Sequence, residues 1–188
     1  MYKRRCSMSS MIYLAADVPM ETVKNPHYKM FSVNEALDFG ITDIPEFMLE
    51  PDFDKDKPNV ICWSDIEMEI DTENDYVRID DFDDDLAIFP FDEGLFCQLF
   101  TEKKYRMQLE WGRYSEGRAK LLIEYIKRCL ATTDEVEIWH LWLGEESYVL
   151  PKKQRVSVLE LAPEHIERLE EFAVHNEPCR QYCLVVKR

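Results

Sequence analysis

The sequence predicts an α+β protein, and three observations lead to that class. Residues 105–111 alternate apolar and polar side chains, which is the period of a half-buried strand. Residues 115–131 place apolar side chains at the three- and four-residue spacing of an amphipathic helix. The apolar segments that follow continue as strand, strand, helix and strand. The C-terminal half is therefore predicted to form a βαββαβ unit, ferredoxin-like or related.

The elements of this half follow from local signals. Ser115 is a suitable N-cap for the first helix. Residues 136–143 are apolar on both faces of the expected strand, which indicates a buried strand. Residues 156–161 form the next expected strand, and Pro163 suits the first turn of a second helix that ends near residue 174. Residues 182–186 form the final expected strand.

The expected topology contains one conflict. A ferredoxin-like order makes strands 105–111 and 156–161 central and puts strand 136–143 at an edge. Strand 136–143 is the most apolar of the chain, and an exposed apolar edge promotes aggregation. We therefore expect strands of the N-terminal half to pair beside residues 136–143 and extend a mixed or antiparallel sheet. Both helices should cover one face of that sheet.

The N-terminal half gives shorter signals. Strands are expected in four segments, at residues 12–16, 59–63, 66–70 and 86–89. A short helix is expected over residues 32–38, with Ser32 as N-cap, Glu35 three residues later and Gly40 at its end. We expect a single domain over residues 1–188, made of an acidic β-rich part (1–100) and the βαββαβ part (101–188).

Charge is distributed unevenly along the chain. Residues 1–100 hold 23 acidic and 8 basic side chains, whereas residues 101–188 hold 15 of each. Residues 35–93 alone hold 21 acidic and 3 basic side chains, a net charge of −18. Such a field repels nucleic acids and anionic lipids and attracts basic surfaces. We therefore expect a basic protein partner, no nucleic acid and no membrane, and the oligomeric state stays open.

Cysteine usage and apolar runs predict a cytoplasmic protein. No apolar run approaches the roughly 18–20 residues that span a bilayer. The basic opening is followed by an apolar stretch, residues 11–16, that is too short for a signal peptide. The six cysteines include Cys62, Cys97 and Cys129 in apolar segments, where a free thiol acts as a small hydrophobe. Reduced thiols are therefore expected.

The densest acidic cluster is the candidate partner-binding face. Its members are Asp80, Asp81, Asp83, Asp84, Asp85, Asp92 and Glu93. Read as a calcium loop that starts at Asp81, the cluster has Leu86 where the tight turn needs glycine, and Asp92 rather than glutamate at the last position. The spacing of His175, Cys179 and Cys183 fits no common zinc finger. No metal or cofactor is therefore predicted.

The sequence shows no catalytic motif. His140 has no recognisable nucleophile elbow near it, so a core or subsurface histidine with satisfied hydrogen bonds is expected. Glycine-rich phosphate loops are absent. Trp63, Trp111 and Trp142 are candidate aromatic contacts for a partner, because tryptophan is enriched in binding hot spots. They are alternatively large core side chains.

These patterns predict a non-enzymatic acidic binding protein that docks on a basic partner, as immunity proteins and inhibitors do. The alternative is a small-molecule-binding or enzymatic domain with a pocket between the two halves, near Trp111, His140 or Trp142. A third interpretation is that the acidic surplus serves only solubility.

The N-terminal segment Met11-Ile-Tyr-Leu-Ala-Ala-Asp17, with Cys6 before it and Phe31-Ser-Val33 after it, resembles the opening of a group of uncharacterised bacterial proteins. Lys57-Pro-Asn-Val60 is similar as well. The glycine- and cysteine-rich segment of that group is replaced here by Cys62-Trp-Ser-Asp-Ile-Glu. The resemblance covers about a third of the chain. It implies a bacterial, cytosolic origin and transfers no function.

Overall fold

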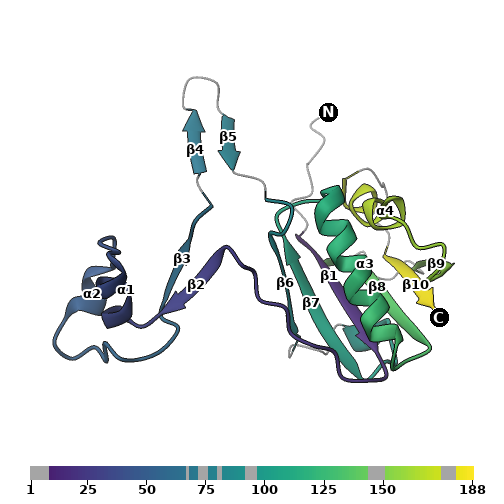
Figure 1. Ribbon diagram of the computed structural model, residues 1–188, viewed down its shortest axis with the longest axis horizontal. Helices are drawn as coiled ribbons and strands as arrows, with labels where there is room; N and C mark the ends of the chain where they lie inside the picture. The colour runs from purple at the N-terminus through teal and green to yellow at the C-terminus, as the bar shows by residue number, and fades with distance from the viewer. Residues whose placement is uncertain are drawn as a thin grey trace, which may run out of the picture. The chain divides into compact units, whose positions relative to one another are not determined.

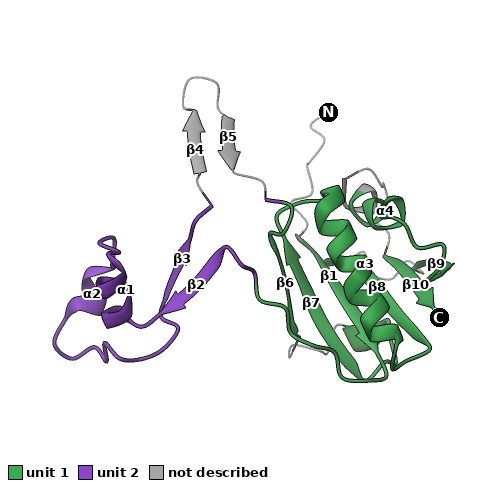
Figure 2. Cartoon of the chain, in the orientation of Figure 1, with its two compact units in different colours: residues 1–24, 83–188 green, residues 25–82 purple. Residues whose placement is uncertain are grey.

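A computed structural model describes residues 9–66, 68–71, 76–79, 82–91, 97–143, 151–174 and 181–188. The chain forms two compact units (Figure 2): unit 1 is Met1–Lys24 with Asp83–Arg188, and unit 2 is Asn25–Phe82. The boundaries between the units lie at 24/25 and 82/83, so unit 2 is an insertion in the sequence of unit 1. None of the described helices is long and apolar enough to cross a membrane.

Unit 1 is built on a six-stranded mixed sheet in the order β6-β7-β1-β8-β10-β9 (Figure 1). Its strands are β1 (Ser9–Ala16), β6 (Leu86–Pro90), β7 (Tyr105–Trp111), β8 (Glu135–Leu143), β9 (Lys152–Ser157) and β10 (Tyr182–Lys187). Neighbouring strands are antiparallel except for β9 and β10, which are parallel. The predicted α+β class and the mixed sheet are confirmed.

Helices α3 (Glu116–Leu130) and α4 (Pro163–Val174) cover one face of this sheet, as the periodicity predicts. Ser115 is the N-cap of α3, and its hydroxyl accepts a hydrogen bond from the backbone N–H of Arg118 at 3.2 Å. The apolar sides of both helices lie in one core with the sheet. That core includes Leu14, Leu122, Ile126, Ile138, Ile166, Leu169 and Leu184.

Strand β8 lies inside the sheet, between β1 and β10. This position explains why its sequence is apolar on both faces. The ferredoxin-like order is not confirmed, because β7 is second from one edge and β9 is the opposite edge. The reason is β1, which pairs with both β7 and β8. The expected extension by N-terminal strands is present through β1 and β6, whereas the strand expected at 59–63 pairs in unit 2 instead.

The second face of the sheet has its own buried cluster. It contains Tyr13, Ala15, Cys97, Trp139, Leu141, Cys183 and Val185, with Phe91 and Phe100 packed against it. Cys97 belongs to a short 3-10 helix, Cys97–Leu99. The buried Glu137 accepts hydrogen bonds from the Thr101 hydroxyl at 2.6 Å and from the Trp139 indole N–H at 2.8 Å. These contacts tie the segment after the 3-10 helix to β8.

Unit 2 pairs strands β2 (Tyr28–Phe31) and β3 (Ile61–Ser64) in an antiparallel ribbon. Helix α1 (Val33–Phe39) has the predicted capping box, in which Ser32 and Glu35 exchange side-chain and backbone hydrogen bonds. Gly40 ends the helix with a φ of 94°, a value that favours glycine. The unit also contains α2 (Glu46–Leu49) and a second pair, β4 (Met68–Asp71) with β5 (Tyr76–Ile79). Its small core includes Val33, Ala36, Ile44 and Ile61.

Candidate docking surface

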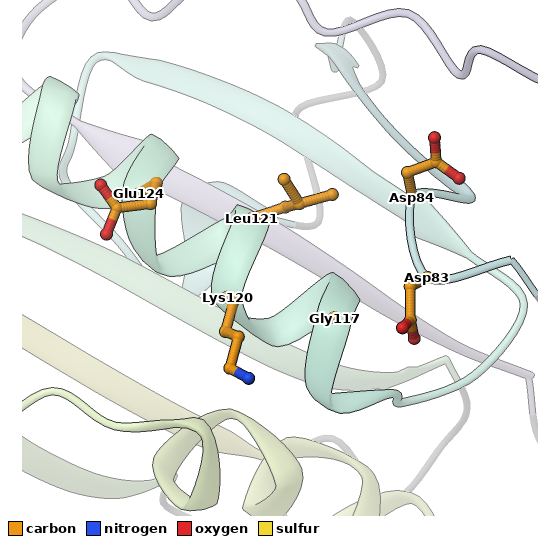
Figure 3. Close-up of a pocket in the computed structure, with 6 residues that line it drawn as sticks. All are labelled: Asp83, Asp84, Gly117, Lys120, Leu121 and Glu124. Carbon is orange, nitrogen blue, oxygen red and sulfur yellow. The ribbon is translucent and has the colours of Figure 1, made fainter.

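The predicted acidic face is only partly within the described residues. Asp80, Asp81, Asp92 and Glu93 lie outside them. Asp83 and Asp84 are exposed, and they line a hollow of about 360 Å³ beside α3 (Figure 3). The other lining residues are Gly117, Lys120, Leu121 and Glu124. Trp111, His140 and Trp142 do not line this hollow, so it gives no support to a small-molecule site at those residues.

The hollow contains groups of both signs. Lys120 forms an ion pair with Glu116 at 2.6 Å, and this neighbour raises the pKa of the Lys120 ammonium. Leu121 is 45% exposed beside it. Among the described residues, no group of three or more histidine, cysteine or acidic side chains is placed to hold a metal ion. The hollow therefore presents acidic, basic and apolar side chains together at the surface beside α3.

Asp85 differs from its two neighbours. Its side chain is 12% exposed, and its Oδ2 lies 3.3 Å from Nη2 of Arg118, whose side chain is 1% exposed. The carboxylate thus faces the interior of unit 1 rather than a partner. The physical reason is its place directly before β6, where Arg118 from the first turn of α3 requires a counter-charge.

His140 is buried in the core at 1% exposure, as expected. Its hydrogen bonds are not satisfied, however, because neither ring nitrogen has a partner. Burial lowers the pKa of His140 to about 4, so the imidazole is neutral near pH 7. The half-buried Trp142 ring meets it edge-on at 5.3 Å between ring centroids. The half-buried Trp111 packs against the helix-side core.

Unit 2 combines charge with exposed apolar side chains. It holds 16 acidic and 4 basic residues, a net charge of −12, so it carries most of the chain's −15. It also holds six of the nine exposed large hydrophobic residues found among the described residues. These six are Tyr28, Met30, Leu37, Phe39, Phe47 and Leu49. Sequence reasoning identified the acids and missed the apolar members, because exposed and core apolar residues look alike in a sequence.

Of the three predicted tryptophan contacts, Trp63 is the one in unit 2. Its ring meets Phe39 edge-on at 5.3 Å, and Phe39 in turn lies 5.0 Å from Phe31. The Lys29 ammonium lies 5.1 Å from the Phe39 ring centroid and 5.3 Å from that of Trp63. An aromatic cluster with a bound cation therefore lies on the most acidic unit of the chain.

Comparison of the chain with protein-family models, with curated proteins and with solved structures finds no match.

Proposed function

We propose that this chain is a non-enzymatic binding protein whose unit 2 docks on a basic protein partner. The observation that carries the proposal is the coincidence, within 58 residues, of a net charge of −12 and six exposed large hydrophobic side chains. We define the docking surface as the exposed acidic and apolar residues of unit 2.

This coincidence favours docking over solubility alone. Acidic residues that serve only solubility need no apolar neighbours, and designed soluble surfaces keep large exposed hydrophobics few. Large apolar side chains that stay exposed among polar residues are found at interaction sites. Carboxylates near such side chains speed encounter with a basic surface and repel acidic ones, while the apolar contacts lengthen the life of the complex.

The class of partner follows from the sign of the charge. Nucleic acids and anionic membranes are repelled by the field of unit 2. Proteins that bind nucleic acids carry cationic grooves, and a carboxylate-rich surface competes for such a groove. The charge pattern therefore best supports an inhibitor- or immunity-like role in a bacterial cytoplasm. The aromatic side chains of unit 2 supply the anchors that tight interfaces bury.

The test uses two variants of the full chain with equal changes in charge. The first neutralises Asp43, Glu46, Glu50 and Asp52 in unit 2, which are all exposed, as the amides Asn or Gln. The matched control neutralises Glu102, Glu110, Glu160 and Glu164 in unit 1, which are also exposed, as Gln. Immobilised wild-type protein is used at low ionic strength to capture partners from a bacterial lysate, and each captured protein is then purified.

The proposal expects a basic partner whose affinity falls at least tenfold between roughly 50 and 300 mM salt, because exposed charge pairs are screened. The unit 2 variant should weaken binding about tenfold or more, and the unit 1 control should change it by less than about threefold. Capture of no basic protein, binding that is insensitive to salt, or equal losses in both variants would contradict the proposal.

A further inference from the structure

Three aromatic side chains of unit 2 form what we call the aromatic corner: Phe31, Phe39 and Trp63. Phe31 and Trp63 come from the two paired strands, and Phe39 is the last residue of α1. The Phe39 ring is tilted by 31° to Phe31 and by 70° to Trp63. Phe39 is 49% exposed, so the corner is open to a partner.

The strand register explains how the corner forms. Lys29 lies directly opposite Trp63, and Phe31 lies directly opposite Ile61. Since alternate residues of a strand share a face, Lys29 and Phe31 lie on the same face of the ribbon as Trp63 and Ile61. Phe31 and Ile61 also belong to the core with α1, which fixes this as the helix-covered face. The three rings of the corner are thus held by two paired strands and one helix.

Lys29 shows that the corner binds a cation. Its ammonium lies within 5.3 Å of both the Phe39 and the Trp63 centroids, inside the range in which a ring face attracts a positive charge. Within the described part of the chain, no carboxylate lies at ion-pair distance from this ammonium, although the unit holds 16 acidic residues. The Lys29 ammonium is therefore held by the Phe39 and Trp63 rings and not by a carboxylate of the described residues, although unit 2 is rich in carboxylates.

We propose that the aromatic corner is the subsite of the docking surface that receives a lysine or arginine side chain of the basic partner, which exchanges with Lys29. This inference rests on the proposed function and names the group that the partner contributes. Lys29 is exposed on a flexible four-carbon stem, so its ammonium can leave the rings for water when a partner's cation arrives. An arginine suits the site best, because its planar guanidinium stacks on aromatic rings.

The exchange predicts that Lys29 competes with the partner. Removing its ammonium empties the corner, and removing a ring weakens the corner for either cation. Lys57 offers a matched control, since it is an exposed lysine of the same unit. Lys29→Met and Lys57→Met remove the same charge from unit 2, so any difference between them reports the corner rather than the overall field.

The probe is a defined peptide of alternating arginine and valine with blocked ends, titrated into the full chain by calorimetry at low salt. We expect Lys29→Met to bind it about two- to fivefold more tightly than Lys57→Met does, the range of a cation–π contact at an exposed site. Adding Phe39→Leu should abolish this difference, as a double-mutant cycle requires for groups that interact. Trp63→Leu provides the same test through the other ring, and circular dichroism verifies folding.

The outcomes separate this inference from the proposed function. Equal affinities of Lys29→Met and Lys57→Met, or a difference that survives both ring substitutions, would overturn the corner as a cation subsite. The proposed function would stand in that case if binding still weakened with salt and with the four-residue unit 2 variant. A peptide that binds none of these proteins at low salt would overturn both.

Discussion

Nη2 of Arg118 lies 3.3 Å from Oδ2 of Asp85, inside unit 1. The second terminal nitrogen, Nη1, donates to the backbone carbonyl of Arg113 at 2.8 Å. A single guanidinium therefore joins α3 to the start of β6 and to the turn that precedes α3. Asp85→Ala should reduce the free energy of unfolding by about 3 kcal/mol, because it removes a charged partner from a buried guanidinium. Urea denaturation measures this loss.

The control for this prediction is Glu102→Ala, which removes an exposed carboxylate of the same unit and should change stability by less than about 0.5 kcal/mol. The double variant Asp85→Leu with Arg118→Met should recover much of the loss, since apolar side chains of similar volume often replace a buried ion pair without cost. Equal unfolding midpoints for Asp85→Ala and Glu102→Ala would show that the pair contributes nothing.

Position 117 requires glycine because the Asp83 side chain approaches it closely, and not because of its backbone angles. A Cβ at this position would overlap the Cβ and Cγ of Asp83. Gly117→Ala should therefore destabilise unit 1 by about 1–3 kcal/mol, although alanine is favoured over glycine in helices by about 1 kcal/mol. Combining Gly117→Ala with Asp83→Gly removes the overlap and should restore stability in thermal unfolding. If the single variant were more stable than wild type, the close approach would be irrelevant.

His140 should make unit 1 sensitive to acid. Burial lowers its pKa to about 4 in the folded chain, against about 6.5 when unfolded. Between these values the unfolded chain binds the additional proton, so stability falls as the pH decreases from about 6.5 to 4. The loss reaches about 3 kcal/mol below the folded pKa.

His140→Leu should remove that part of the slope, which denaturant titrations at pH 7 and pH 4.5 measure. Carboxylates contribute to the same trend: Lys103 lowers the pKa of Glu135, so protonation of Glu135 also reduces stability in acid. Wild type and His140→Leu share the contribution of Glu135, so the difference between their pH dependences of stability reports His140 alone. His165→Leu serves as a control, because the His165 ring, unlike that of His140, is not a buried ring without a hydrogen-bond partner: its Nδ1 accepts from the backbone N–H of Ala162. Parallel slopes for wild type and His140→Leu would contradict the prediction.

The sequence predicts those elements whose signals are local. Helix α1 follows from Ser32, Glu35 and Gly40, and the structure shows each in its expected capping role. Helix α3 follows from its apolar spacing after Ser115. Strand β8 was expected to be covered on both faces because it is apolar throughout, and both buried clusters of unit 1 include its residues. These features depend on neighbours a few residues apart, which periodicity reveals.

Pairing between distant strands could not be predicted in the same way. The topology depends on β1, which lies between β7 and β8, and no local pattern specifies that choice. Strand β9 was expected at 156–161 but occupies Lys152–Ser157, because an edge strand needs backbone pairing with β10 and not an apolar sequence. Within the candidate site, Asp83, Asp84 and Asp85 are chemically identical in sequence, yet Asp85 alone of the three is buried.

Unit 1 should fold without unit 2. All six strands of its sheet and both of its helices lie outside residues 25–82, and so do its two buried clusters. The chain leaves and re-enters unit 1 close together, since Val23 and Ile88 exchange backbone hydrogen bonds of 2.7 and 2.9 Å. Replacing residues 25–82 by a short glycine- and serine-rich linker therefore removes no strand pairing from the sheet.

The shortened protein should keep a cooperative thermal transition, because its core is intact. It should also lose affinity for the basic partner, since it retains a net charge of about −3 and none of the docking surface. Calorimetry tests the first expectation and salt-dependent binding tests the second. An unfolded product would show that unit 1 needs unit 2 for its stability. A folded product that still binds the partner at full affinity would place the docking surface on unit 1.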